Sequence, residues 1–328
     1  MPTPRPARWL AATVVLLGFI AAGPVRAAPL EGAPEVTPTR ATARVWYVQG
    51  AGGMATRANA AFNSNAAFVV TDDGVVVFDT LGTPALGARL KQAIARVTPQ
   101  PIRRVIVSHY HADHFYGLQS LAGPGVEIWA HAKARATLAS DLTRSRLEQR
   151  RRDLAPHVDD RTMLVPATRW LTFDDGPELA FTLGNVRFRL IDVSGAHSDE
   201  DLMLFVEGER ALLAGDLYFS GRLPYVGNAD SKAWLAAMDR IAPLAPKVVI
   251  PGHGAASTDP QPDIALTREY LQFLRNAMGA AVRDLKSFDE AYAQTDWSRF
   301  AGLPAFAAAN RINAYGTYLR MEQELLNR

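Results

Sequence analysis

The sequence has 328 residues, of which 48% are hydrophobic and 21% are charged, with a formal net charge of +2. This is the balance of an ordinary soluble globular protein with a sizeable core. The sequence contains no cysteine. Disulfides and cysteine-ligated metal sites are therefore excluded, and any metal must be held by nitrogen and oxygen atoms.

The first 27 residues have the layout of a secretory signal peptide. Arg5 and Arg8 precede an uncharged stretch over residues 10–23, and Val25-Arg26-Ala27 offers small residues at the two positions that a signal peptidase reads. The stretch is shorter than the about 20 apolar residues that cross a bilayer as a helix. We therefore expect cleavage after Ala27 and export to the periplasm; the alternative is an uncleaved N-terminal anchor.

Export changes the charge of the protein. The leader carries three arginines and no acid, so the 35 basic side chains fall to 32 against 33 acidic ones, a net charge near −1. A nearly neutral chain gives no electrostatic reason to expect nucleic acid or an anionic membrane as a partner. A small-molecule substrate is the expected partner.

Strands and helices alternate along the rest of the chain. Short apolar runs predict strands over residues 45–48, 67–70, 75–78, 105–107, 126–130, 186–193, 202–206, 211–214 and 248–250. Helical patterns occur at 84–97, 115–121, 131–153 and 232–241, and then from 262 to 328 with an interruption near Pro304. This order predicts sheets covered by helices. We expect a tether over 28–40, one domain over 41–261, and a helical extension over 262–328 that packs on it.

Five of the predicted strands lead into a histidine or an aspartate. The residues are Asp79, His109, His197, Asp216 and His253. Ligands of open α/β sheets gather at the carboxyl ends of strands, so these side chains should converge on one site. Five of the seven histidines of the chain fall in these segments.

The segment His109-Tyr-His-Ala-Asp-His114 is the strongest of these motifs. His109 and His111 are two residues apart, so on an extended segment they project to the same face. Asp113 is expected at the N-cap of the following helix, which would orient its carboxylate. Imidazole nitrogen and carboxylate oxygen are zinc ligands.

The candidate ligands are too numerous for one closed zinc site of about four ligands. They suit two metals that share one carboxylate. The alternative is a set of core or surface histidines in a sugar- or peptide-binding domain, but burying so many unpaired imidazoles would be costly. The candidates are His109, His111, Asp113, His114, His197, Asp216 and His253.

The succession His-x-His-x-Asp-His, Gly-Ala-His, Gly-Asp and Pro-Gly-His, each after a strand, resembles the metallo-β-lactamase superfamily from about Val45 to Gly254. The resemblance implies an α+β fold, a four-layer αββα sandwich, here with a helical C-terminal tail. It implies two Zn²⁺ ions. His109, His111 and His197 would hold the first, Asp113, His114 and His253 the second, with Asp216 between them. Asp79 would hold the histidine loop in place.

Several short segments of the sequence narrow the resemblance further. Within the superfamily, the chain is similar to exported hydrolases associated with sulfur oxidation and periplasmic quinoproteins. The segments that carry this similarity are Val-Ser-His-Tyr-His-Ala-Asp-His-Phe-Tyr-Gly-Leu-Gln, Leu-Leu-Ala-Gly-Asp-Leu and Arg-Ile-Asn-Ala-Tyr. The implied reaction is hydrolysis of an ester, thioester, lactone or similar small substrate by a hydroxide shared by two metals. The hydroxide forms because the metals lower the pKa of their bound water to about 7. Asp113 is the candidate for passing the proton to the leaving group. Tyr218 is the candidate for a hydrogen bond to the developing oxyanion.

Three alternatives remain open at this stage. An iron-binding persulfide dioxygenase shares much of the ligand set and would hold one iron. β-Lactamase activity is a second alternative, although the superfamily's lactamases lack an acidic bridging ligand at the position of Asp216. A non-catalytic metal-binding protein is the third.

Two further groups of residues accompany the motifs. The run Arg144, Arg146, Arg150, Arg151 and Arg152 reads most simply as a charged helix face, with a lid that captures acidic substrates as the alternative. An aromatic pocket wall, or else core packing, is expected from Tyr110, Phe115, Tyr116, Tyr218, Phe219 and Tyr225.

Overall fold

The computed structural model describes residues 32–327. The predicted signal peptide, residues 1–27, lies outside the described residues, as does the start of the predicted tether. Among the described residues no helix is both long and apolar enough to cross a membrane.

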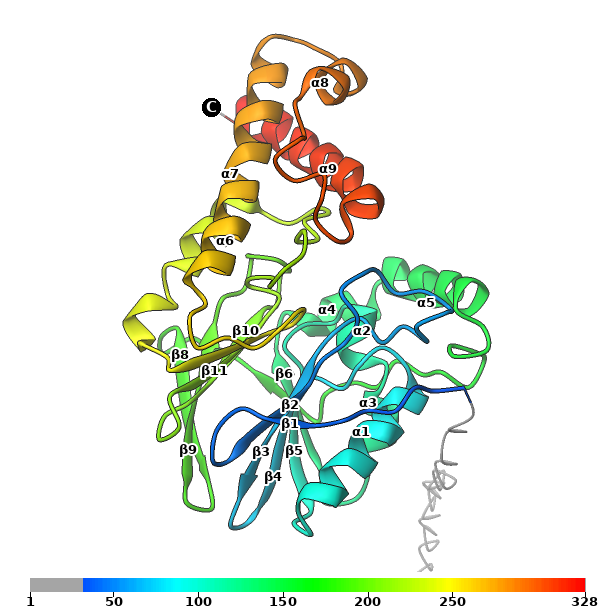
Figure 1. Cartoon of the computed structure of the whole chain (residues 1–328), viewed down its shortest axis with the longest axis vertical. Coiled ribbons are helices and arrows are strands. Elements are labelled where there is room, and N and C mark those ends of the chain that lie inside the picture. The colour runs from blue at the N-terminus through cyan, green and yellow to red at the C-terminus, as the bar shows by residue number, and fades with distance from the viewer. Residues whose placement is uncertain (1–31, 328) are drawn as a thin grey trace, which may run out of the picture.

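Two β-sheets lie face to face in the middle of the molecule (Figure 1). One sheet has the strand order β1 (Thr39–Arg40), β2 (Val45–Val48), β3 (Ala66–Thr71), β4 (Gly74–Phe78), β5 (Ile102–Ile106), β6 (Glu127–His131), β7 (Arg169–Leu171). The other has the order β12 (Val248–Pro251), β11 (Ala211–Gly215), β10 (Leu202–Val206), β9 (Val186–Asp192), β8 (Glu178–Leu183). Strands β4 to β7 are parallel, and so is the pair β11–β12.

Strands β4, β10 and β11 are apolar and buried at every position because both faces of each sheet are covered there. In β4, Val76 and Phe78 point into the core between the two sheets, whereas Val75 and Val77 point to the helices outside. Helices α1 (Pro84–Val97) and α3 (Leu118–Leu121) cover the first sheet, and α6 (Ser231–Met238) and α7 (Gln261–Arg283) cover the second. The αββα sandwich expected from the sequence is confirmed.

The predicted helices differ from the structure at two places. The helix predicted over 115–121 is two single turns, α2 (Ala112–Phe115) and α3, because the N–H of Gly117 donates to Leu81 O at 3.0 Å. The stretch predicted over 131–153 is α4 (Ala134–Ala139) and α5 (Asp141–Asp153). The break falls at Ser140, whose hydroxyl accepts a hydrogen bond from Thr143 N and caps α5.

Three strands were not predicted. β1 and β7 have two and three residues, too few to give a pattern. β8 lies at the edge of its sheet and alternates exposed and half-buried positions. The end of the predicted tether also packs on the domain, since Val36 is completely buried and Thr39 pairs with Tyr47.

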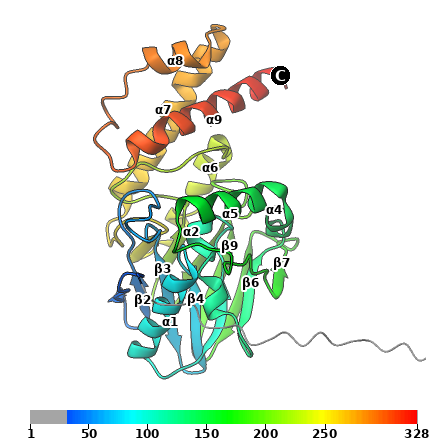
Figure 2. The same ribbon diagram turned by 90° about the vertical axis from the view of Figure 1, so that its right-hand side faces the viewer.

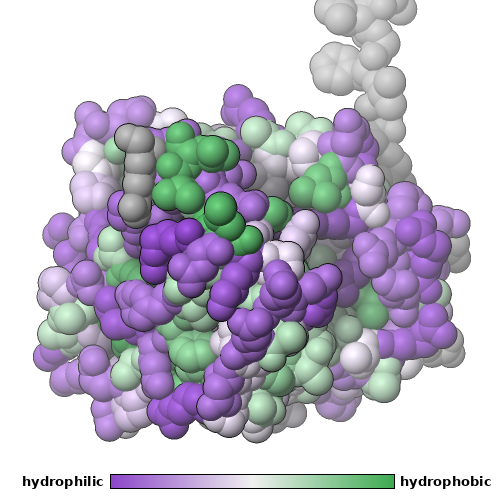
Figure 3. Space-filling model, turned by 90° about the horizontal axis from the view of Figure 1, so that it is seen from above, coloured by the Kyte–Doolittle hydropathy of each residue, from purple (hydrophilic) through white to green (hydrophobic). Residues whose placement is uncertain are grey.

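The C-terminal helices rise above one end of the sandwich (Figures 1 and 2). Helix α7 leaves the second sheet, and α8 (Phe288–Gln294) and α9 (Phe306–Leu326) pack on its outer half. Helix α5 lies across the same end of the sandwich, below α9 in Figure 2. Viewed from the side of these helices, the surface is mainly hydrophilic with separate hydrophobic patches (Figure 3).

Candidate metal centre

Both sheets deliver ligand residues to the end of the sandwich that faces α5. The loop after β5 carries His109 and His111, the short helix α2 that follows carries Asp113 and His114, and the loop after β9 carries His197. Asp216 follows β11 directly, and the Pro-Gly-His253 turn follows β12. The structure thus brings all seven predicted ligand residues together.

The first ligand group consists of His109, His111 and His197. Nδ1 of His111 lies 3.1 Å from Nε2 of His109 and 2.9 Å from Nε2 of His197. Tetrahedral ligands at about 2.0–2.1 Å from zinc are roughly 3.3 Å apart, so these three nitrogens are spaced almost as one ion requires.

The second group consists of Asp113, His114 and His253. Nε2 of His253 lies 3.4 Å from Oδ2 of Asp113 and 3.4 Å from Nε2 of His114, and the Asp113–His114 pair is separated by 3.9 Å. This group also has the spacing of ligands around one ion.

Asp216 lies between the two groups. Its Oδ2 is 3.4 Å from Nε2 of His197 in the first group, and its Oδ1 is 3.3 Å from Nε2 of His114 in the second. A Cβ atom on Gly252 would lie only 2.0 Å from Asp216 Oδ1, so a residue without a side chain is required at that position.

The hydrogen bonds around the imidazoles fix which nitrogen faces the centre. The Nδ1–H of His114 donates to Asp79 Oδ2 at 2.9 Å, and the Nδ1–H of His253 donates to Asn63 O at 2.7 Å. His109 donates from Nδ1 to the Ser108 hydroxyl at 2.9 Å. The three Nε2 atoms therefore present lone pairs to one another and to carboxylate oxygens. Such an arrangement is repulsive without a cation, so the donor set fits metal ions.

The charge states of the isolated residues agree with this fit. Burial and the neighbouring histidines hold the pKa of His109 well below its usual range and lower those of His111 and His197 to about 3 and about 4. Neutral imidazole is the form that binds metal. Burial also acts to lower the pKa of His114, but the carboxylates of Asp216, Asp113 and Asp79 outweigh it and raise the value to about 10. Three carboxylates close together thus attract positive charge here.

Asp79 holds the histidine loop, as the sequence predicted. Its Oδ1 accepts a hydrogen bond from Ser108 N at 2.8 Å, and its Oδ2 accepts from the Ser108 hydroxyl and from His114. The φ angle of Asp79 is 62°, in the left-handed region that costs energy for a residue other than glycine. Asp113 differs from the expectation in one respect: His111 is the N-cap of α2, and Asp113 lies in the first turn.

Sequence reasoning missed the polar segment before β3. Asn63 Nδ2 donates to Asp113 Oδ2 at 2.8 Å, and the Ser64 hydroxyl donates to Asp113 O. Asn65 Nδ2 bonds to Pro251 O and Gly254 O on either side of His253. The run Asn-Ser-Asn ahead of a buried strand was the available signal, because amides there must find partners.

A cavity of about 440 Å³ opens above the ligands, a volume typical of small-molecule sites. Four of the predicted aromatic residues line it, namely Tyr110, Phe115, Tyr116 and Tyr225. The other two do not. Tyr218 and Phe219 are fully buried in the core of the second sheet, and the Tyr218 hydroxyl has no hydrogen-bond partner among the described residues.

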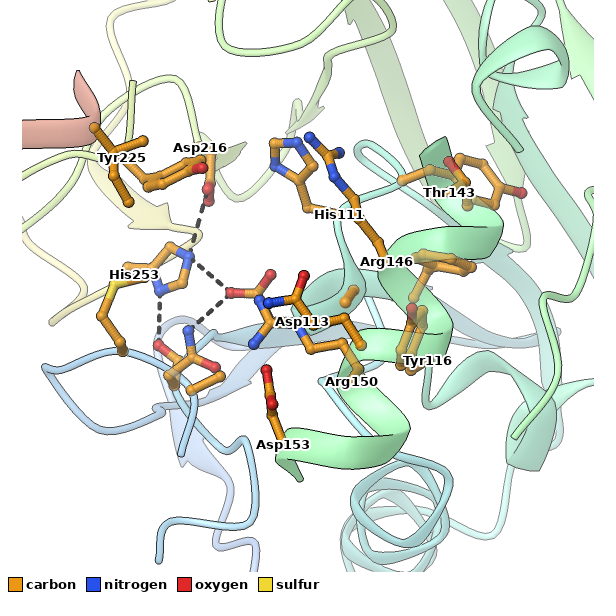
Figure 4. A pocket seen from close by; sticks show the side chains of 18 of the residues that line it. His111, Asp113, Tyr116, Thr143, Arg146, Arg150, Asp153, Asp216, Tyr225 and His253 are labelled. Carbon is orange, nitrogen blue, oxygen red and sulfur yellow. Dashed lines mark hydrogen bonds and ion pairs between the residues drawn. The ribbon is translucent and has the colours of Figure 1, made fainter. Parts of the chain in front are cut away.

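Arginines form part of the cavity wall. Arg222 is 2% exposed and donates to Gly53 O at 2.9 Å, so it fixes the loop that covers His253. Arg146 and Arg150 line the cavity from α5 together with Thr143, Gln149 and Asp153 (Figure 4).

Comparison with known proteins identifies the class that this fold and this site define. Residues 60–253 match the family model described as "Metallo-beta-lactamase superfamily", and the chain belongs to that superfamily. The relatives found in the comparisons are named as alkylsulfatases and metallo-beta-lactamases.

Among proteins of known function, the chain is similar to the linear primary-alkylsulfatase of Pseudomonas sp. (strain ATCC 19151), with 20% identity over 56% of this chain and 40% of the relative. Among solved structures it is similar to the inverting sec-alkylsulfatase Pisa1 from Pseudomonas sp. (TM-score 0.68, 18% identity, 87% of this chain, 50% of that one). It is also similar to a metallo-beta-lactamase from Pontibacter korlensis (TM-score 0.55, 20% identity, 73% of this chain, 99% of that one). The chain thus spans about half the length, or less, of the alkylsulfatases that it matches.

Proposed function

We propose that the chain is a hydrolase that holds two zinc ions bridged by Asp216 and acts on a small ester-type substrate. The observation that carries the proposal is the position of Asp216, whose two carboxylate oxygens lie 3.3–3.4 Å from imidazoles of different ligand groups. Seven ligand residues around one cavity exceed what a single zinc ion takes.

Two divalent ions bound there would supply an activated water, by lowering its pKa to about 7, and would polarise the reacting group of the substrate. The residues of the chain orient this chemistry. Asp79, Ser108 and Asn63 fix the imidazole tautomers through the hydrogen bonds described above. Phe115 and Tyr116 contribute aromatic ring surface to the cavity wall.

In the hydrolysis itself, the water oxygen bonds to the electrophilic centre of the substrate and the ester bond breaks. We assign to Asp113 the role of taking the proton that the water loses and delivering it to the leaving-group oxygen. Its Oδ2 faces His114, His253 and Asn63, and its side chain lines the cavity. The pKa of Asp113 lies below its usual range because neighbouring histidines outweigh the effect of burial. Its carboxylate is therefore ionised and able to accept a proton.

The oxyanion donor that we propose is Tyr225 in place of Tyr218. Tyr225 lines the cavity, and its ring lies 6.5 Å from that of His111. The fully buried Tyr218 is not part of the cavity wall.

The candidate substrates are an ester, a thioester or a lactone and, from the names of the relatives, an alkyl sulfate or a β-lactam. The proposal is tested by removing metal from the purified protein, restoring zinc, and measuring hydrolysis of one representative of each class. We expect turnover of at least one substrate that disappears with chelation and returns with zinc. Turnover that survives complete metal removal would rule the proposal out.

A further inference from the structure

Two arginines on α5 reach into the cavity above the ligand groups. We propose that Arg146 and Arg150 form an anion-binding subsite and that the substrate of the hydrolase is therefore an anionic ester. This inference rests on the proposed function for the reaction, but the subsite itself stands on the geometry of α5.

The spacing of the two residues places both in the cavity. They are four positions apart on a helix of 13 residues, so their side chains emerge on the same face. Both line the cavity together with His111 and Asp113. Figure 4 shows the two side chains extending from α5 toward these ligand residues.

Neither guanidinium has a partner within residues 32–327. No hydrogen bond, ion pair or ring-stacking contact joins Arg146 or Arg150 to another described side chain, although Asp153 also lines the cavity. Two other arginines of α5, by contrast, are engaged. Arg144 pairs with Asp141, and Arg151 pairs with Glu148 at 2.6 Å and donates to Thr162 O at 2.9 Å.

The charge of the cavity favours an anion. Its lining contributes three arginines, Arg146, Arg150 and Arg222, against three aspartates, Asp113, Asp153 and Asp216. Two of these aspartates belong to the ligand groups. Because the three carboxylates only balance the three guanidinium groups, two bound divalent ions would leave the cavity with a net positive charge that favours an anion. Planar guanidinium groups bind carboxylate, sulfate and phosphate through paired N–H donors.

The binding test uses the zinc-loaded protein and calorimetric titration with inorganic sulfate and, separately, phosphate. The variant is the double substitution Arg146→Gln with Arg150→Gln. The control is Arg152→Gln, which removes one positive charge from the same helix at an exposed position outside the cavity wall. We expect at least a tenfold weaker Kd in the double variant and a change within about twofold in the control. Equal binding by wild type and double variant would overturn the subsite.

The kinetic test compares esters with one leaving group, 4-nitrophenol. The neutral member is the acetate, and the anionic members are the hemisuccinate, the sulfate and the phosphate, which distinguish carboxylate, sulfate and phosphate as the recognised group. In the double variant we expect kcat/KM to fall about tenfold or more for the preferred anionic ester and to stay within about twofold for the acetate. An equal fall for the acetate, or no fall for any anionic ester, would contradict the inference.

The two tests separate the subsite from the proposed reaction. If anion binding depends on the arginines but the protein hydrolyses none of the esters, the subsite is supported and the proposed function is contradicted. If zinc-dependent hydrolysis is the same with and without the arginines, the proposed function is supported and the subsite is contradicted.

Discussion

Three of the five imidazoles in the ligand groups are oriented from behind by a hydrogen bond. Asp79, Ser108 and Asn63 O accept from the Nδ1 atoms of His114, His109 and His253, and the opposite nitrogens face the shared space. Such supporting contacts set the tautomer and position of a ligand, and losing one typically costs 10- to 100-fold in metal affinity or activity.

A residue-scale prediction concerns Asp113. In Asp113→Asn the amide keeps the shape of the side chain but cannot accept a proton, so we expect kcat to fall by about 10²-fold or more. Bound metal is measured in the same samples by elemental analysis. A variant that keeps its metal and nearly full turnover would show that Asp113 does not transfer the proton.

The second residue-scale prediction contrasts two tyrosines. We expect Tyr225→Phe to lower kcat/KM about tenfold or more, because it removes a donor from the cavity wall. Tyr218→Phe should leave kcat/KM within about twofold and stability unchanged or slightly higher, because the lost hydroxyl is buried without a partner. The measurements are steady-state kinetics and thermal unfolding of both variants. The opposite pattern would show that Tyr218, and not Tyr225, is the donor to the oxyanion.

At this scale the sequence predicted the ligands better than the cavity wall. The ligands follow strand ends directly, so local order is enough to find His109 or His253. The wall depends on how a distant helix crosses the site, and neither the burial of Tyr218 nor the direction of Arg146 is encoded by neighbouring residues.

At the scale of elements, α9 positions the loop that carries Tyr225. Asn313 is completely buried; its Oδ1 accepts from Val226 N at 2.8 Å and its Nδ2 donates to Pro224 O at 2.8 Å. Gly316 lies against the same loop, where an added Cβ would be 1.8 Å from Gly227 O. Asn313 lies within the segment Arg-Ile-Asn-Ala-Tyr noted in the sequence, and Gly316 follows it directly. The contact with the loop therefore explains why an asparagine and a glycine stand there.

We therefore predict that Asn313→Ala costs about 2–4 kcal/mol of stability, since it leaves buried loop amides unpaired, and that it lowers kcat/KM as well. The control is Asn276→Ala on α7, where an exposed amide bonds only to Gln272. Denaturant unfolding and steady-state kinetics are the measurements. A destabilised variant with unchanged kcat/KM would show that the loop does not need α9.

A contact between a histidine and a carboxylate joins the two sheets outside the ligand groups. His131 Nε2 at the end of β6 lies 3.6 Å from Asp192 Oδ1 at the end of β9. Burial alone would raise the pKa of Asp192, but hydrogen bonds from His131 and Ser194 lower it to about 2. A carboxyl with a lowered pKa stabilises the fold above its unfolded pKa of about 3.9, and this stability is lost as the pH falls through about 2.

The pH prediction compares wild type with Asp192→Asn in denaturant unfolding. Because the carboxylate is partly solvated, we expect the wild type to be about 1 kcal/mol more stable at pH 5–6, with the difference vanishing toward pH 2. A difference that does not change with pH would mean that the charge of Asp192 contributes nothing.

At the scale of the molecule, the layered fold followed from the alternation of apolar runs and helical patterns, whereas three of the four edge strands did not. β7 and β8 lack the continuous apolar character of a fully buried edge strand such as β12, because part of each is exposed. The packing of the C-terminal helices over the site could not be predicted, since amphipathic helices show which face is buried but not against what.

The central claim is that both sheets together hold two metal ions that carry out hydrolysis. Its most direct test is a titration of the metal-free protein with zinc, following bound zinc by native mass spectrometry and ester hydrolysis in the same samples. We expect binding that saturates at two zinc ions per chain, with full hydrolytic activity only when both are bound. A protein that holds one iron per chain and consumes oxygen in the presence of a persulfide, without hydrolysing esters, would contradict it.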